Sequence, residues 1–234
     1  MVAEACYLIE DQRRMAEAKN YFAWQASLIK PHLGQRVVEV GCGAGNFTNF
    51  LLDRELVIAL DPDPGALAAH RERFGARPNL RLIRAAAADV RGLDPFSPDS
   101  CVCLNVLEHV ADDFEAIRAM ASILPRGGKI VLWVPALPAL YGPIDRNLGH
   151  HRRYRKADLH ALARDASLTI AKLHHVNLAG SLGWWMNARI LRLQEQSPAQ
   201  IRFFDRYVVP PMAVLERIVA PPFGQSLFAV LLKP

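Results

Sequence analysis

Short apolar runs recur along residues 36–134, and the segments between them carry helical patterns or glycine turns. This alternation constrains the fold more than any other feature of the sequence. It predicts a doubly wound, mainly parallel α/β sheet, in which right-handed crossovers bring the strand carboxyl ends to one ligand-binding edge. Strands are expected at 36–40, 56–60, 80–83, 101–104 and 129–134, and helices at 46–54, 64–74 and 113–124.

The segments on either side of this repeat are predicted to be additions to a single domain, 1–234. Helical periodicity precedes the repeat, prolines and glycines punctuate the chain after its fifth strand, and a helix and two more strands follow. The predicted parts are a helical cap (1–33), a cofactor-binding core (34–135), a substrate loop (136–156), a helix (158–165), a strand (168–175), a helical insertion or lid (177–225) and a last strand (227–232).

Composition excludes several protein classes. No apolar run reaches the roughly 18 residues that a membrane helix needs, and the first residues lack the pattern of a signal peptide. Four cysteines, too few for a disulfide framework, predict free thiols in a reducing, cytoplasmic setting. The net charge of +5 is a mild bias that does not identify a partner. The cysteines are Cys6, Cys42, Cys101 and Cys103.

A glycine-rich turn follows the first predicted strand and places Gly41, Gly43 and Gly45 at the ligand edge. Glycine tolerates positive φ there and lets backbone amides approach a ligand closely. A dinucleotide fingerprint would need a third glycine where Asn46 stands, and a phosphate-binding P-loop would need Gly-Lys-Ser/Thr. The carboxylate of Glu39 suits an ammonium or sulfonium group and would repel a diphosphate. The alternative is a plain strand–helix turn.

Asp61 ends the second predicted strand. An acidic residue at this position can accept hydrogen bonds from both hydroxyls of a ribose. The alternative is that Asp61 or Asp63 caps the following helix.

The ordered motifs 39–45, Asp61, Asp89, 105–109 and 124–128 together resemble those of class I S-adenosylmethionine (SAM)-dependent methyltransferases. The resemblance implies seven strands, the last antiparallel and inserted beside the fifth. It implies SAM as the cofactor, with the three glycines around its methionine portion. The remaining implied roles are Glu39 supporting the methionine portion, Asp61 on the ribose, Asp89 near the adenine amino group, and Asn105 near the methionyl amine and the reactive methyl.

The predicted substrate loop contains Gly-His-His-Arg-Arg-Tyr at 149–154, which resembles a bacterial subset of type 11/12 methyltransferases. Either histidine is a candidate general base, and either arginine a candidate ligand for a carboxylate or phosphate. The alternative is a solvated basic turn with a packed tyrosine. The candidate residues of this loop are Asp145, His150, His151, Arg152, Arg153 and Tyr154, with Asp145 expected to offset part of the positive charge.

Two further positions leave alternatives open. His109 is either an acid–base residue or a histidine bonded to Glu108 or Asp112, and we find no acidic residue that completes an evident metal set with a histidine pair. No metal is therefore expected. The Trp184–Trp185 pair predicts either an apolar lid over a hydrophobic acceptor or a helix packed against the sheet.

Together these features predict methyl transfer from SAM to a small or lipid-linked acceptor, with oxygen favoured and an anionic group as one option. The alternatives are a non-catalytic SAM-binding subunit for regulation or assembly, a nucleic-acid-modifying methyltransferase and a nicotinamide oxidoreductase. The chain carries no appended RNA-binding motif, so no nucleic-acid partner is expected. Peripheral membrane contact, the acceptor atom and the oligomeric state are left open.

Overall fold

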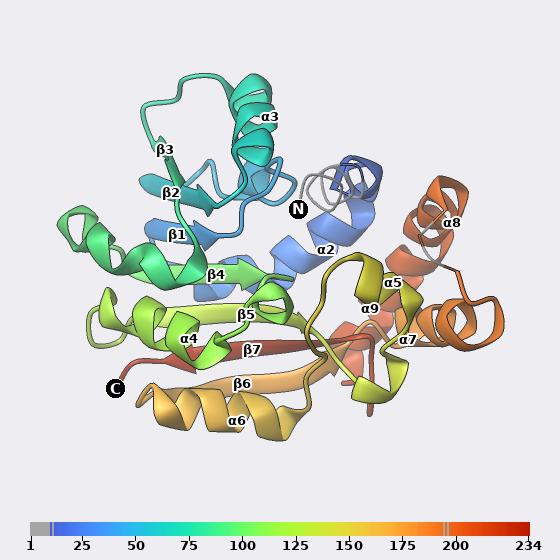
Figure 1. Cartoon of the computed structure of the whole chain (residues 1–234). Helices are drawn as coiled ribbons and strands as arrows, with labels where there is room; N and C mark the ends of the chain where they lie inside the picture. Colours follow the sequence, from blue (N-terminus) through green and yellow to red (C-terminus); the bar gives the residue numbers. More distant parts are fainter. Residues whose placement is uncertain (1–9, 11, 194, 196) are drawn as a thin grey trace.

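A seven-stranded sheet forms the centre of the computed structural model, which describes residues 10, 12–193, 195 and 197–234; Cys6 lies outside them. The strands are ordered β3-β2-β1-β4-β5-β7-β6 (Figure 1). The first five are parallel, whereas β7 runs antiparallel between β5 and β6. This confirms the predicted sheet, including the antiparallel last strand beside the fifth. The strands are β1 (Arg36–Val40), β2 (Leu56–Asp61), β3 (Leu80–Arg84), β4 (Ser100–Leu104), β5 (Lys129–Pro135), β6 (Thr169–Val176) and β7 (Ser226–Leu232).

Helices cover both faces of the sheet. Helices α4 and α6 pack on one face, and α2 and α9 contribute to the core on the other. Helices α7, α8 and α9 belong to the insertion between β6 and β7 and gather beyond one end of the sheet (Figure 1). The α-helices are α2 (Lys19–Ile29), α3 (Pro64–Phe74), α4 (Asp113–Ser122), α5 (Pro143–Asn147), α6 (Lys156–Asp165), α7 (Leu178–Trp185), α8 (Pro198–Phe203) and α9 (Val209–Ile218).

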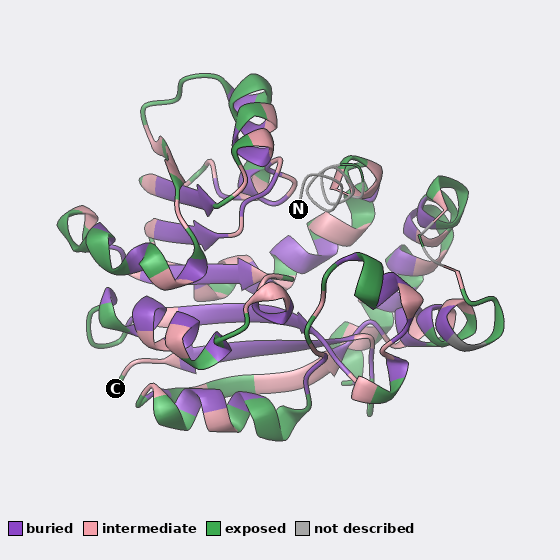
Figure 2. Ribbon diagram, viewed as in Figure 1, coloured by how far each residue is buried: buried purple, intermediate pink, exposed green. Residues whose placement is uncertain are grey.

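Alternation along the strands divides the interior into two cores, and the central strands are buried between the helices, whereas the edge strands β3 and β6 are partly exposed (Figure 2). On β5, Leu132 faces the core that α4 and α6 cover, whereas Trp133 faces the core that contains α2. The indole of Trp24 meets that of Trp133 edge to face, with ring centroids 5.3 Å apart. Burial on both faces explains the near-continuous apolar composition of these strands.

The helix expected at 46–54 is one of the sequence predictions that the structure corrects. This stretch forms only a 3₁₀ helix, Thr48–Phe50, followed by turns. Asn, Thr and Phe have modest helix propensity, and the hydroxyl of Thr48 donates to Glu39 across 2.6 Å. That side-chain contact holds the segment in a conformation other than a regular helix.

The segment predicted as a helical insertion combines helices of different kinds. Helix α7 continues into a π-helical turn, Met186–Ile190, and α9 begins at Val209 after a second π-helical turn, Phe204–Val208. Within the described residues, no helix combines the length and the apolar character required to cross a bilayer.

Candidate active site

A cavity of about 520 Å³ opens at the carboxyl ends of the central strands. The glycine turn after β1 lines one side, and the loop after β4 lines another. The substrate loop and the helical insertion complete the wall. Its size is that of a small-molecule site.

The three glycines of the turn adopt positive φ, with values of 74° at Gly41, 52° at Gly43 and 82° at Gly45. The amides of Gly41 and Cys42 both donate to the carbonyl of Leu60, each across 2.8 Å. A Cβ on Gly41 would overlap the side chain of Val106. The turn therefore requires glycine for both its backbone conformation and its close packing.

Glu39 lies buried under this turn and lines the cavity. Its carboxylate accepts a hydrogen bond from Thr48, whose hydroxyl oxygen lies 3.0 Å from Nε2 of His70. Burial raises the pKa of Glu39 to about 8, against the lowering effect of the Thr48 hydrogen bond. A cation bound in the cavity would favour the ionised carboxylate.

Asp61 supports the glycine turn directly. Its carboxylate accepts hydrogen bonds from the amides of Gly43 and Asp63, each across 2.9 Å, and burial raises its pKa. The N-cap of α3 is Asp63, which accepts from the amide of Gly65. The capping function therefore belongs to Asp63, and the ribose-binding function of Asp61 stays a prediction.

Asn105 and Asp89, the two other residues assigned to the cofactor by resemblance, lie in different environments. Asn105 lines the cavity at a positive φ of 52°, and its amide donates to the carbonyl of Trp133 across 2.8 Å. Asp89 is exposed, accepts from the amide of Ala86 and is not among the described residues that line the cavity. Its predicted contact with adenine remains a prediction.

Gln12 is a cavity residue that the sequence patterns did not single out. Its side-chain oxygen accepts from the amide of Ala44 across 2.9 Å, and its carbonyl accepts from the side chain of Asn46. The first helical segment therefore closes over the glycine turn. In the sequence, the only signal for Gln12 was its polar amide side chain within the predicted helical cap.

The fold also brings Glu108, His109 and His150 together on the cavity wall. The two imidazole rings meet edge to face with centroids 4.7 Å apart, and Nε2 of His150 lies 4.0 Å from Oε1 of Glu108. Burial raises the pKa of Glu108 to about 7 and lowers that of His109 to about 4. The sequence indicated Glu108 only as a partner for His109, and in the structure neither of its carboxylate oxygens has a hydrogen-bond partner among the described residues.

A buried ion pair lies behind this wall. The carboxylate of Asp145, which is fully buried, lies 3.0 Å from Nδ1 of His150 and accepts from Nε of Arg153 across 2.7 Å. The guanidinium of Arg153 also stacks over the ring of Trp184, 4.7 Å from its centroid. Trp184 is buried, whereas half of Trp185 is exposed, so the two tryptophans have different environments.

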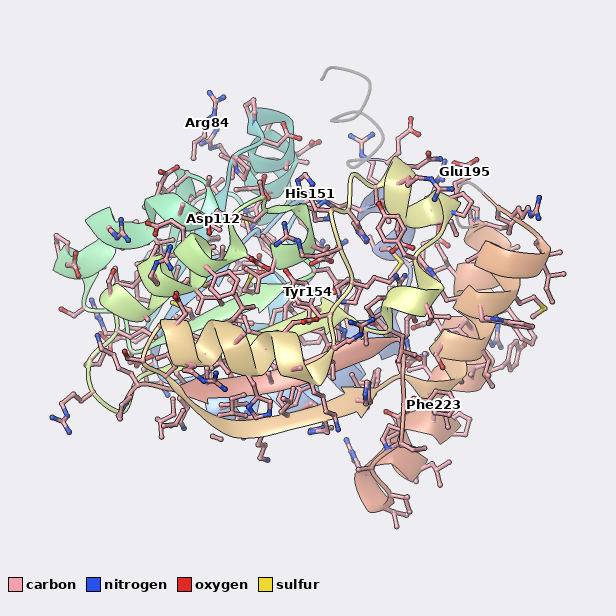
Figure 3. The ribbon with its side chains drawn as sticks, turned by 60° about the horizontal axis from the view of Figure 1, so that its bottom comes forward. Arg84, Asp112, His151, Tyr154, Glu195 and Phe223 are labelled. Atoms are coloured by element: carbon pink, nitrogen blue, oxygen red, sulfur yellow. The ribbon has the colours of Figure 1, made fainter. Side chains whose placement is uncertain are left out.

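The other candidates of the substrate loop lie away from the described cavity wall. His151 is exposed, and Arg152 pairs with Asp113 across 2.9 Å. Tyr154 is 2% exposed and donates to the other oxygen of Asp113 across 2.8 Å. Figure 3 shows these two different depths within one short segment, with His151 near the surface and Tyr154 inside. Of the six loop residues, His150 and Arg153 line the cavity.

Comparisons with known proteins agree with this geometry. Residues 38–130 match the family described as a methyltransferase domain. An uncharacterized methyltransferase of Mycobacterium tuberculosis is 29% identical over 191 residues, which cover 79% of this chain and 70% of the relative. A ubiquinone biosynthesis O-methyltransferase of Xanthomonas euvesicatoria is 34% identical over 103 residues, 42% of each chain. The crystal structure of a SAM-dependent methyltransferase from Thermotoga maritima shares the fold, with a TM-score of 0.67 at 15% identity over 99% of this chain and 98% of that one.

Proposed function

Because the chain is a class I SAM-dependent methyltransferase, we propose that it methylates a hydroxyl oxygen of a small or lipid-linked acceptor. The acceptor would bind in the cavity between Asn105 and His150. The observation that carries this proposal is the cluster of Glu108, His109 and His150, which lines the same cavity as the glycine turn.

The residues around the glycine turn fit SAM. Bound SAM supplies a sulfonium methyl group, which forms a new bond to the acceptor oxygen while the electron pair of the broken C–S bond stays on sulfur. The positive-φ glycines leave the backbone uncovered, and Glu39 offers a carboxylate to a cationic group. Asp61 holds the amide of Gly43 and so fixes the shape of the turn.

The cluster of Glu108, His109 and His150 would activate the acceptor. A hydroxyl is a weak nucleophile until its proton is removed or its charge is stabilised. Asp145 orients His150, so that Nε2 of the imidazole is directed to Glu108. An acceptor oxygen placed between this cluster and the methyl group would be aligned for in-line transfer.

The apolar side chains that line part of the cavity favour an acceptor with an apolar part. The insertion contributes Trp184, Met186, Ile201 and Phe203 to the wall. Exposed apolar side chains continue over the outside of the insertion, and the end of α9 projects from the body of the molecule near Phe223 (Figure 3). This continuity supports a lipid-linked acceptor and peripheral contact with a membrane surface. The similarity to an enzyme named as a ubiquinone biosynthesis O-methyltransferase supports oxygen as the acceptor atom.

The two arginines give unequal support to an anionic acceptor. Arg152 is paired with Asp113 and is not among the described residues that line the cavity, whereas Arg153 lines the cavity although Asp145 already balances its charge. Arg153 is therefore the better candidate for contact with an acceptor carboxylate or phosphate.

The proposal is tested by incubating the protein with methyl-labelled SAM and matched phenol and aniline acceptors, each with and without a prenyl chain. We expect label in the ether products and a preference for the prenylated phenol. His150→Ala should lower kcat by at least about 100-fold, within the range for acid–base groups, while the exposed control His151→Ala should keep it. SAM affinity should be the same in both variants. Transfer to the anilines alone would overturn O-methylation.

A further inference from the structure

Glu108, His109 and His150 converge although the last two are 41 positions apart in the sequence. Each residue offers one ligand atom, and these atoms all lie within 4.8 Å of one another. The 3₁₀ turn Leu107–His109 after β4 presents the first two, and the substrate loop presents the third. Two imidazole nitrogens and a carboxylate oxygen are thus gathered at one point of the cavity wall.

Glu108 is the member of this group whose carboxylate lacks hydrogen-bond partners within the described part of the chain. The residue is 1% exposed, and neither carboxylate oxygen has a hydrogen-bond partner among the described residues. An ionised carboxylate in that position accepts no hydrogen bond from the described residues, and a protonated one has a hydroxyl without an acceptor among them. Either state carries the free-energy cost of a buried unpaired polar group. A cation between the carboxylate and the two imidazoles would remove this cost.

We propose that Glu108, His109 and His150 bind one divalent transition-metal cation on the acceptor side of the cavity. Nitrogen ligands and a carboxylate are a donor set that such cations favour, and three protein ligands leave a position open for substrate or water. Ligands bound at about 2.0–2.2 Å in a tetrahedral site lie about 3.3–3.6 Å apart. The ligand atoms in the structure, which lie within 4.8 Å of one another, need to close by up to about 1.5 Å to reach this range.

The surroundings of the cluster resemble the outer shell of a metal site. Asp145 lies 3.0 Å from Nδ1 of His150 and leaves Nε2 free to ligate, an arrangement that orients histidine ligands in many metalloproteins. Arg153 balances the charge of Asp145 across 2.7 Å. The carboxylate of Glu108 then supplies the net negative charge that favours a cation.

The proposal deepens the proposed O-methylation and rests on it for the group that fills the open position. An acceptor hydroxyl bound there would release its proton to water more easily, because the cation stabilises the oxyanion. The oxyanion then attacks the methyl group, and its negative charge lies between two cationic centres. In this arrangement His150 is a metal ligand held by Asp145, and it acts on the acceptor through the cation.

The test uses tag-free protein that has been dialysed against EDTA and then titrated with Zn²⁺ or Co²⁺, without acceptor or SAM. We expect one Zn²⁺ per chain, measured by calorimetry and elemental analysis, and visible d–d bands from bound Co²⁺. The isosteric change Glu108→Gln should weaken Zn²⁺ binding by at least 10-fold, as should His150→Ala. His151→Ala, the exposed neighbour, is the matched control and should bind like the wild type.

Circular dichroism of each variant establishes that it is folded before the titration is interpreted. Failure of the folded wild type to bind either cation overturns the metal site, as does equal binding by Glu108→Gln. These results are independent of the acceptor. Ether products from metal-free protein would defeat the role of the cation in O-methylation, whereas Zn²⁺ binding with transfer only to amines would defeat O-methylation.

Discussion

Asp145 and His150 form a buried pair in which Nδ1 of the imidazole donates to the carboxylate across 3.0 Å. Burial tends to raise the pKa of Asp145, but the hydrogen bond from His150 and the charge of Arg153 hold it below the ordinary value. The carboxylate is therefore ionised at neutral pH, which fixes the tautomer of His150 and directs Nε2 to Glu108. The orientation of the His150 ring in the cavity wall depends on this pair.

Asp145→Asn should lower the free energy of unfolding by about 3–5 kcal/mol, because it leaves the buried guanidinium of Arg153 without its counter-charge. Urea unfolding followed by circular dichroism measures the change. In the wild type this contribution is complete above the ordinary pKa of 3.8 and is lost as the pH falls through the lowered folded-state pKa. The control is Asp53→Asn, which breaks an exposed ion pair with Lys30 and should cost less than about 1 kcal/mol. Similar losses in both variants would contradict the importance of the buried pair.

Glu39 should release a proton when SAM binds. Its pKa of about 8 in the free protein should fall when a cationic group lies beside the carboxylate, because a nearby positive charge favours the ionised form. Apparent SAM affinity should therefore increase with pH up to about 8 and then level off. Calorimetry at pH 7 in buffers of different ionisation enthalpy counts the released protons. Glu39→Gln should abolish the release, and a wild type that releases none would refute the proposed contact.

Asp61→Ala should weaken SAM binding by about 1–3 kcal/mol, the range for hydrogen bonds to a charged group. The carboxylate holds the amide of Gly43, and the predicted ribose contact would be lost as well. Asp63→Ala is the matched control, because Asp63 lies two residues away and caps α3. That control should lose about 1 kcal/mol of stability with little change in affinity. Equal affinities in the two variants would reduce Asp61 to a structural residue.

Tyr154→Phe should leave the turnover rate unchanged and lower stability by about 0.5–1.5 kcal/mol, the usual net value of one hydrogen bond. The hydroxyl of Tyr154 is buried and donates to Asp113, away from the described cavity wall. Steady-state kinetics and urea unfolding of the same preparation separate the two effects. Turnover that falls by an order of magnitude or more, with unchanged stability, would support a catalytic function for Tyr154 instead.

The sheet could be predicted because its signals are local. Residues such as Val37, Ile58 and Cys101 belong to short apolar runs that only a buried strand accommodates, and glycines or prolines mark the ends. The helix expected at 46–54 is wrong because the contact from Thr48 to Glu39 decides that segment. The hydrogen bond between these two side chains cannot be read from a local helical or strand pattern in the sequence.

Only part of the candidate site could likewise be predicted from the sequence. The glycine turn, Asp61 and Asn105 follow strand ends, so their common edge could be inferred from strand order alone. The cluster of Glu108, His109 and His150 could not, because it depends on how the substrate loop folds back against the turn after β4. The amide of His151 donates to the carbonyl of Glu108 across 2.7 Å, and this backbone contact fixes the two segments together. In the sequence, the only available signal was a Glu-His pair a few residues after a predicted strand.

Calorimetric titration of the folded protein with SAM tests the central claim most directly. We predict saturable binding of one SAM per chain, and no binding by Gly43→Val, where a side chain would meet Gln12 at a φ of 52°. Circular dichroism should show that the variant keeps its sheet. Absence of SAM binding by folded wild-type protein would contradict the account.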